Sequence, residues 1–250
     1  MLHQFSRTEL AIGAEGLEAL KNSTVAVLGI GGVGSIAVEA LARTGVGRII
    51  LIDKDVVDIT NINRQIHALT TTIGQKKADL MCERVKLINP ECETIALNMF
   101  YTEETYEQLF QYDIDYVLDA SDTIMYKIHL IKECLKRKIP MLSSMGAANK
   151  MDPTRFQVAD ISKTSVDPMA RVIRTKLRKD GIKKGVKVVF STEDPVKPRE
   201  DVTKKIAPEG AKIRKAKQPP ASNSFVPPVV GLIMVSVAVR ELLEINGIKI

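Results

Sequence analysis

Four glycines stand close together in the sequence and suit a phosphate-binding turn: Gly29, Gly31, Gly32 and Gly34. They lie between an apolar run at residues 25–28 and a helical pattern at residues 35–44. A Cβ at such positions would block the tight turn and keep a phosphate away from the backbone. The N-terminus of the following helix would present unpaired N–H groups and a positive dipole end to the anion. The glycines therefore predict a nucleotide site, with a plain tight turn as the structural alternative.

A carboxylate follows the second apolar run of the chain, residues 49–52. This residue, Asp53, lies 19 positions after Gly34. A carboxylate at this place accepts hydrogen bonds from the ribose hydroxyls of a bound nucleotide, although a cap on a turn is an alternative role. An NAD-dependent dehydrogenase would explain the glycines and Asp53 as well as an ATP-dependent enzyme would. Further residues must therefore separate these two classes.

Polar residues farther along the chain favour ATP. They form three groups: Asn61, Arg64 and Gln65; Gly74, Gln75 and Lys77; Asp119 and Asp122. All are expected at or beyond the carboxyl ends of strands, where an open α/β sheet binds its ligands. Arg64 and Lys77 supply positive charge suited to a triphosphate, and Asp122 is suited to hold Mg²⁺. Each residue alone would be interpreted as a solvated surface charge, but their joint placement predicts ATP with Mg²⁺ rather than a dinucleotide.

Strands and helices are expected to alternate around these residues. Apolar runs predict strands at residues 25–28, 49–52, 94–99 and 116–118, and a further strand that begins at residue 140. Apolar periodicity predicts helices at residues 35–44, 77–88 and 124–138. This order predicts an α/β fold with a Rossmann-like, mostly parallel sheet and helices on both faces.

The chain changes character after Pro153. Strands are expected at residues 156–159 and 187–190, on either side of a basic helix at residues 168–179. The segment 197–224 combines several prolines with many lysines, which predicts a mobile loop.

The last apolar run, residues 226–239, is too short to span a bilayer. We therefore predict a core helix there and no stable membrane insertion. The expected division of the chain is a nucleotide-binding core at 1–165, a basic insertion at 166–224 and a C-terminal helix at 225–250 that returns to the core.

Charge is distributed unevenly along the chain, whose formal net charge is +6. Residues 171–217 contain 16 Lys and Arg against 6 Asp and Glu, a local balance of +10, whereas the remainder carries −4. One basic segment on a mildly acidic body suggests a polyanionic partner, and a solvated loop is the alternative.

The chain has three cysteines, Cys82, Cys92 and Cys134, and none forms a C-x-x-C pair. Neither a zinc site nor a thioredoxin-type redox site is therefore expected. The first ten residues are polar and lack the apolar stretch of a secretion signal. We expect a cytoplasmic protein whose thiols are reduced.

The nucleotide-site motifs together resemble those of the E1-like (ThiF/MoeB-type) activating enzymes, which include molybdopterin-synthase adenylyltransferases and ubiquitin activators. The matching motifs are Gly29–Gly34, Asp53-x-Asp55, Asn61-x-x-Arg64-Gln65, Gly74-Gln75-x-Lys77 and Asp119-x-x-Asp122. The resemblance implies that Asp53 holds the ribose, that Asn61, Arg64 and Lys77 contact the phosphates, and that Asp122 binds Mg²⁺. It also implies a homodimer in which Arg7 reaches the triphosphate bound by the partner subunit.

Further segments resemble one branch of this family, the tRNA threonylcarbamoyladenosine dehydratases: residues 3–9, 63–69, 159–161, 167–172 and 224–227. The resemblance implies ATP-dependent ring closure on a modified adenosine beside the tRNA anticodon, with the basic region 166–224 facing the RNA. The threonyl carboxylate would attack the α-phosphate of ATP. A neighbouring group of the same side chain would then capture the acyl-adenylate and release AMP.

Three other functions stay open at this point. An activator of a ubiquitin-like or sulfur-carrier protein shares the first half-reaction, but such proteins often carry zinc cysteines or an acyl-accepting cysteine. An NAD(P) oxidoreductase needs no cluster of phosphate-binding cations, and a regulatory nucleotide-binding module needs no magnesium carboxylate. The cysteines are expected to be structural, as are His67 and His129.

Overall fold

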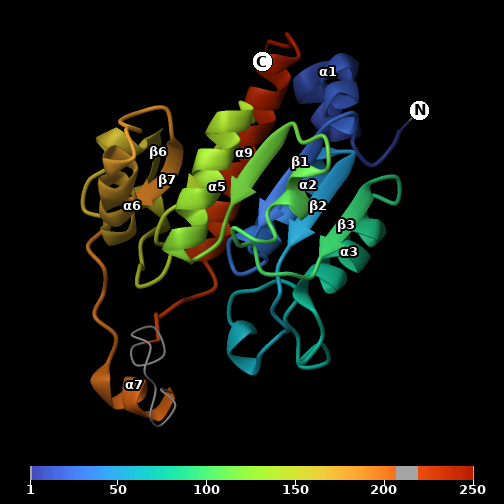
Figure 1. Cartoon of the computed structure of the whole chain (residues 1–250). Coiled ribbons are helices and arrows are strands. Elements are labelled where there is room, and N and C mark those ends of the chain that lie inside the picture. The colour runs from blue at the N-terminus through green and yellow to red at the C-terminus, as the bar shows by residue number, and fades with distance from the viewer. Residues whose placement is uncertain (1, 207–218, 250) are drawn as a thin grey trace.

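One seven-stranded sheet forms the centre of the computed structural model, which describes residues 2–206 and 219–249 (Figure 1). The strands are β1 (Thr24–Leu28), β2 (Arg48–Ile52), β3 (Glu93–Leu97), β4 (Tyr116–Asp119), β5 (Met141–Ser144), β6 (Phe156–Asp160) and β7 (Lys187–Ser191). Their order across the sheet is β3-β2-β1-β4-β5-β7-β6. Every pairing is parallel except β6 with β7. The predicted α/β fold with a mostly parallel sheet is confirmed.

The helices connect and cover these strands. They are α1 (Ser6–Lys21), α2 (Gly34–Thr44), α3 (Lys77–Ile88), α4 (Glu107–Phe110), α5 (Ile124–Arg137), α6 (Pro168–Lys179), α7 (Glu200–Ile206) and α9 (Val226–Ile245). Three short 3₁₀ turns, η1 (Ile59–Asn61), η2 (Pro153–Arg155) and η3 (Ile161–Lys163), interrupt the connections. The predicted elements in the first 160 residues agree with the observed ones to within a few positions.

Alternate residues of the central strands point into different hydrophobic cores. Val25 and Val27 of β1 pack in one cluster with α2, α3 and α9. Ala26 and Leu28 pack on the other face with residues of α4 and α5. Strands buried on both faces must be apolar at every position, which is why these segments appear in the sequence as unbroken apolar runs. A third cluster joins α5 to α6 and β7.

Helix α9 packs closely against α2, and glycine makes this approach possible. A Cβ at Gly231 would lie 2.5 Å from the Val33 carbonyl oxygen. The helix is long and apolar enough to meet a composition test for a membrane span, but 56% of that window is buried inside the protein. Residues from Val226 to Leu243 contribute to the core, as predicted for a core helix, although the helix continues six residues beyond the expected end.

Three helices were not expected from the sequence: α1, α4 and α7. Helix α7 corrects the prediction of an unbroken loop over residues 197–224. Its first turn carries Glu200 and Asp201 and its last turn carries Lys204 and Lys205, an arrangement that suits the helix dipole. The rest of that predicted loop, from 207 to 218, lies outside the described residues.

Candidate nucleotide-binding and adenylation site

The carboxyl ends of three neighbouring strands bring the predicted site residues together. In the parallel register, Leu28 of β1 pairs with Ile52 of β2 and with Asp119 of β4. The residues that follow these strands are tied by backbone hydrogen bonds, with the Gly29 N–H donating to the Ile52 carbonyl oxygen at 2.8 Å. The arrowheads of β1 to β4 in Figure 1 point to this common edge. The fold therefore places the glycine turn, Asp53 and the residues after Asp119 at one edge of the sheet.

The glycine turn leaves little room for side chains at Gly29, Gly32 and Gly34, whereas the predicted steric need for glycine does not hold at Gly31, where a Cβ would meet only the Gln65 amide nitrogen at 3.9 Å. A Cβ at Gly34 would lie 1.9 Å from the Gly29 carbonyl oxygen, and Gly29 itself has a φ of +86°. A Cβ at Gly32 would lie 3.0 Å from Pro227 and 3.2 Å from Cγ of Arg64. The turn is thus closed on one side by its own backbone and bordered by the aliphatic part of Arg64. Helix α2 begins at Gly34, so its first N–H groups face the same space, as an anion site requires.

Asp53 ties the glycine turn to the end of β2. Its Oδ2 accepts a hydrogen bond from the Ile30 N–H at 2.6 Å, and its Oδ1 accepts one from the Asp55 N–H at 2.8 Å. Burial raises the pKa of the Asp53 carboxyl, and the two backbone donors together with Lys77 oppose that rise. Each carboxylate oxygen retains a further lone pair, so a ribose hydroxyl could still donate to Asp53.

Lys77 stands at the start of α3, with its amine directed at the same edge. It is buried, and its Nζ lies 3.4 Å from Oδ2 of Asp55. The backbone holds this geometry, because the Lys77 N–H donates to the Asp55 carbonyl oxygen at 3.1 Å. Burial alone would raise the pKa of Asp55, but Lys54 and Lys77 outweigh it and lower that pKa. Lys77 is therefore held at the site with its charge only partly balanced by the half-exposed Asp55.

The segment after η1 carries the other predicted phosphate contacts. Asn61 is buried and shares a capping box with Asp58. Arg64 donates from Nη1 to the carbonyl oxygen of Thr60 at 2.7 Å, and no carboxylate lies within ion-pair distance of it among the described residues. Gln65 is buried beside the glycine turn, and its Oε1 has no hydrogen-bond partner in the described structure. An arginine that forms no ion pair with a described residue suits a site that receives a polyanionic ligand.

The two aspartates of the Asp119-x-x-Asp122 motif have different environments. Asp119 is fully buried, and its Oδ2 lies 3.0 Å from Nζ of Lys127, which is also fully buried. Asp119 Oδ1 accepts hydrogen bonds from the N–H and the hydroxyl of Ser121 at 3.1 and 2.7 Å. Asp122 follows this turn and is exposed, and the Thr123 hydroxyl donates to it at 3.3 Å. Asp119 therefore shapes the turn, whereas Asp122 presents its carboxylate to solvent.

Lys127 is a site-forming residue that sequence reasoning missed. It also donates to the Ser143 hydroxyl at the end of β5, which in turn donates to Asp119 at 2.6 Å. A lysine on an amphipathic helix is usually exposed. The signal that could have identified it is its position on the apolar side of α5, beside Ile128 and Ile131.

Arg7 does not join the other predicted site residues within one chain. It is exposed in the first turn of α1, two positions after Phe5. The Phe5 ring packs against Gly45, because a Cβ built at Gly45 would lie 3.6 Å from two ring carbons of Phe5. Gly45 caps the end of α2 opposite Gly34, and a helix of 11 residues is about 16 Å long. Arg7 is therefore roughly one helix length from the glycine turn of the same chain.

His67, Cys92 and Cys134 are buried, and Cys82 is partly buried. Burial lowers the pKa of His67 to about 4, with the charges of Lys77 and Arg84 acting in the same direction, so the ring is neutral. Neither ring nitrogen of His67 has a hydrogen-bond partner in the described part of the chain. Burial raises the pKa of the Cys92 thiol to about 11 and that of Cys134 to about 12, and it also raises that of Cys82. Protonated, buried thiols are poor nucleophiles.

Groups of metal-ligating side chains are absent from the described residues, where no three His, Cys, Asp or Glu gather. A magnesium ion bound with a nucleotide does not need such a group, because one or two carboxylates and the phosphate oxygens complete its coordination. The exposed carboxylate of Asp122 follows Ser121, whose Cα would lie 2.9 Å from a Cβ at Gly29, and it suits that requirement. Asp119 does not, since Lys127 and two hydroxyl groups already occupy it.

The fold and this edge define an adenylating enzyme class, and comparison with known proteins agrees. The chain matches the ThiF family over residues 5–249 and belongs to that family. It is 72% identical to the tRNA threonylcarbamoyladenosine dehydratase of Bacillus subtilis over 249 residues, covering 100% of this chain and 98% of that protein.

Solved structures show the same relationship. The crystal structure of Escherichia coli tRNA N6-threonylcarbamoyladenosine dehydratase in complex with ATP is 37% identical and has a TM-score of 0.87. That match covers 98% of this chain and 95% of the other. Escherichia coli MccB, with ATP, is similar at a TM-score of 0.65 and 20% identity, a level that shows the shared fold alone.

Proposed function

We propose that this protein is an ATP-dependent tRNA threonylcarbamoyladenosine dehydratase. The observation that carries the proposal is the convergence of the glycine turn, Asp53, Arg64, Lys77 and Asp122 at one sheet edge, in a chain that matches such a dehydratase over its full length. The ATP complex of the similar Escherichia coli enzyme supports ATP as the nucleotide.

The chemistry proposed for this edge has two steps. A carboxylate oxygen of the threonyl group attacks the α-phosphorus of ATP, an acyl–phosphate bond forms, and pyrophosphate leaves. A nucleophilic atom of the same side chain then attacks the acyl carbon, loses its proton, and displaces AMP. The sum of the two steps removes one water equivalent from the nucleoside, and ATP becomes AMP and pyrophosphate.

The charges at the edge suit the first step. Carboxylate and triphosphate are both anions, and the transition state spreads negative charge over the α-phosphate and the leaving group. Arg64, which forms no ion pair with a described residue, and the buried amine of Lys77 would offset that charge. The second step gains from proximity, since nucleophile and electrophile belong to one side chain.

Mg²⁺ is the second proposed cofactor, with Asp122 as its protein ligand. When bound, the ion would neutralise charge on the phosphate oxygens. Asp122→Ala should abolish turnover and leave the fold intact, because its exposed side chain contributes little to packing. Turnover and the unfolding midpoint are the two measurements. Unchanged activity of Asp122→Ala at saturating Mg²⁺ would show that another group holds the metal.

A homodimer with shared sites is proposed from the position of Arg7. The distance between Arg7 and the glycine turn within one chain supports a role for Arg7 at the partner's site. Arg7→Ala and Arg64→Ala should each inactivate the enzyme. A mixture of the two should recover part of the activity, because a mixed dimer has one site with both arginines. If subunits exchange and no activity returns, Arg7 acts within its own chain.

The tRNA substrate is proposed to contact the basic segment 171–217 of a cytoplasmic enzyme. Its described part includes α6, whose exposed side chains are largely Lys and Arg, while 207–217 lie outside the described residues. The proposed division is a core at 1–165, an RNA-facing region at 166–224 and a returning helix at 225–250.

Incubation with ATP, Mg²⁺ and tRNA carrying threonylcarbamoyladenosine tests the function directly. The tRNA is then digested to nucleosides and their masses are measured. The modified nucleoside is expected to lose the mass of one water. The rival activity is adenylation of a ubiquitin-like or sulfur-carrier protein. The raised pKa values of all three thiols, two of which are buried, disfavour its thioester stage. Carrier adenylation without any change in the nucleoside would support the rival and refute the proposal.

A further inference from the structure

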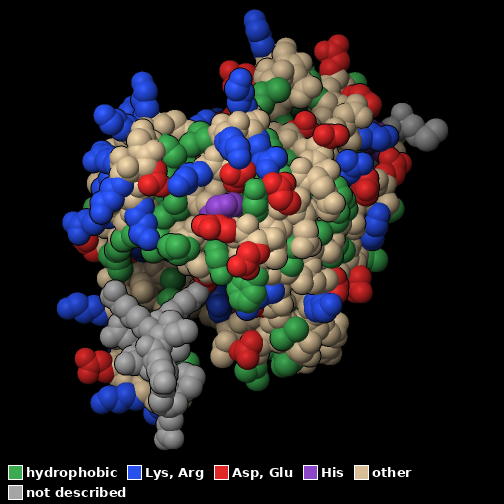
Figure 2. All heavy atoms as spheres, in the orientation of Figure 1, with side chains coloured by type: hydrophobic (Ala, Val, Ile, Leu, Met, Phe, Trp, Pro, Cys, Tyr) green, Lys and Arg blue, Asp and Glu red, His purple; other side chains and the backbone are tan. Residues whose placement is uncertain are grey.

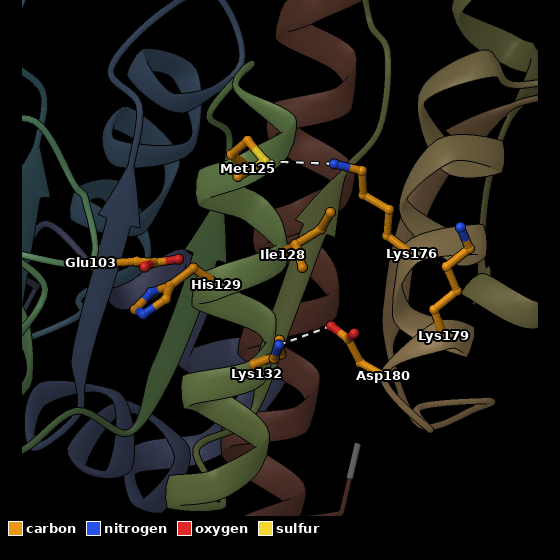
Figure 3. Close-up of a pocket in the computed structure, with 8 residues that line it drawn as sticks. All are labelled: Glu103, Met125, Ile128, His129, Lys132, Lys176, Lys179 and Asp180. Atoms are coloured by element: carbon orange, nitrogen blue, oxygen red, sulfur yellow. Dashed lines mark hydrogen bonds and ion pairs between the residues drawn. The ribbon is translucent and has the colours of Figure 1, made fainter.

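A groove separates α5 from α6 on one flank of the molecule. This flank lies beside the nucleotide edge, the edge of the sheet that carries the glycine turn and Asp53. It encloses about 260 Å³. Figure 3 shows Lys176 of α6 directed at Met125 of α5, Lys179 running along α6, and Glu103 on the other side of α5. The groove therefore has an apolar wall on one helix and a cationic wall on the other.

The lysines of the groove differ in how their charges are balanced. Lys132 and Asp180 form an ion pair of 2.8 Å that bridges the two helices. Nζ of Lys176 lies 3.5 Å from the sulfur of Met125, a weak acceptor that carries no charge. Lys179 makes no ion pair with any described residue. Neither Lys176 nor Lys179 thus forms an ion pair with a described residue, although the carboxylates of Glu103 and Asp180 also line the groove.

The apolar wall of the groove is exposed where it is nearest to the nucleotide edge. Met125 lies in the first turn of α5, three residues after Asp122, and its side chain is 60% exposed. Ile128, one turn further on, is buried against α6. A ligand that extends away from Asp122 would meet Met125 first and the two lysines next.

The surroundings extend the positive charge beyond the groove. Helix α6 also exposes Arg171 and Arg178, and the following loop exposes Lys183 and Lys184. Figure 2 shows Lys and Arg side chains gathered on this flank, where α6 lies in Figure 1. Apolar surface bordered by cations is the combination that single-stranded nucleic acid uses, with phosphates on the cations and sugar or base on the apolar part.

We propose that the α5–α6 groove binds one nucleotide of the RNA that flanks the modified adenosine. Its phosphate lies between Lys176 and Lys179, and its sugar or base packs on Met125. This proposal rests on the proposed function, because it needs an RNA whose modified nucleotide enters the neighbouring cleft. It adds a defined nucleotide subsite to the general backbone contact expected of the basic segment.

The test uses the full-length protein and the tRNA anticodon stem-loop without the modification, so that binding is measured apart from catalysis. Two groove variants are compared with the parent: Lys176→Gln with Lys179→Gln, and Met125→Ala. The matched control changes two exposed lysines at the far end of α5, Lys136→Gln with Lys138→Gln. Dissociation constants are measured over a salt series, and kcat and KM are measured with modified tRNA.

The double lysine variant should bind the RNA roughly tenfold more weakly and lower the salt slope by about 1, because both lysines contact the same phosphate. Met125→Ala should weaken binding by about threefold and leave the salt slope unchanged, since it withdraws only apolar area. Both variants should raise KM for tRNA and keep kcat and ATP affinity, and the control pair should match the parent.

Two results would overturn the proposal in distinguishable ways. If the parent dehydrates modified tRNA and the groove variants bind RNA as the parent does, the groove is not a nucleotide subsite and the proposed function stands. If the parent neither binds RNA nor changes the modified nucleoside, the proposed function fails and the subsite fails with it.

Discussion

Replacing Lys127 by methionine should destabilise the protein strongly, because it leaves the Asp119 carboxylate charged and unpaired in the core. Both side chains have no exposed surface, and their charged atoms lie 3.0 Å apart. Methionine fills a similar volume but supplies neither a charge nor a hydrogen-bond donor. The substitution therefore removes the ion pair and the donation to Ser143 without opening a large cavity.

The size of the effect follows from what remains around Asp119. Removing one partner of a buried ion pair costs about 3–5 kcal/mol of unfolding free energy. The Ser121 N–H, the Ser121 hydroxyl and the Ser143 hydroxyl still donate to the carboxylate, so the lower end, about 3 kcal/mol, is expected. For a chain of this size, that loss lowers the unfolding temperature by roughly 6–12 °C.

A double-mutant cycle separates the ion pair from general damage to the core. Urea unfolding is measured for the parent, Lys127→Met, Asp119→Asn and the double variant. The double variant should recover most of the lost stability, because a neutral pair of similar volume can replace a buried ion pair at little cost. A loss below about 1 kcal/mol in Lys127→Met, or a double variant whose loss equals the sum of the singles, would refute the reasoning.

Three further changes test other parts of the site. Because the folded pKa of His67 is about 4 and the unfolded value is about 6.5, the unfolded chain binds the proton first. The unfolding free energy should therefore fall by roughly 2 kcal/mol from about pH 6.5 to about pH 5. In urea melts, the His67→Leu variant should not show this fall. If its pH dependence equals that of the parent, His67 is not the cause. Joint replacement of Cys82, Cys92 and Cys134 by Ser or Ala should leave ATP-dependent dehydration detectable, whereas lost chemistry in a folded variant would indicate an acyl-enzyme. Gly34→Ala should abolish ATP binding in a calorimetric titration, since its Cβ would overlap the Gly29 carbonyl oxygen; ordinary affinity would mean that the turn can rearrange.

The sheet and most of its helices could be predicted because their signals are local. Strands buried on both faces must be apolar throughout, and helix α3 ends before Pro90, as the sequence indicates. The glycine turn could be predicted for the same reason, since steric exclusion of a Cβ depends on a few neighbouring backbone atoms. Local rules also reproduced the basic helix α6 with its observed bounds.

The parts that could not be predicted depend on distant partners. The burial of Lys127 depends on Asp119 and Ser143, which lie on two other elements and accept its hydrogen bonds. The position of Arg7 depends on how α1 packs beside the end of α2, which no pattern within the first ten residues specifies. Helix α7 was obscured by the prolines around it, although its charge order favours a helix. Sequence reasoning therefore anticipated the local elements better than the distant contacts that hold them in place.

The chain that leaves the basic region returns directly to the nucleotide edge, and this route links the two parts of the proposed enzyme. The Ala221 N–H donates to Oδ1 of Asn149, in the loop that follows β5, at 2.7 Å. The carbonyl oxygen of Ser222 accepts a hydrogen bond from Asn63, the neighbour of Arg64, at 3.0 Å. Pro227 then packs over the glycine turn. One short segment thus borders the phosphate-binding turn and also ends the region proposed to face the RNA. An RNA that binds this region would approach the glycine turn along a segment that is already fixed to it, and such rigid support suits an enzyme that joins a tRNA carboxylate to ATP.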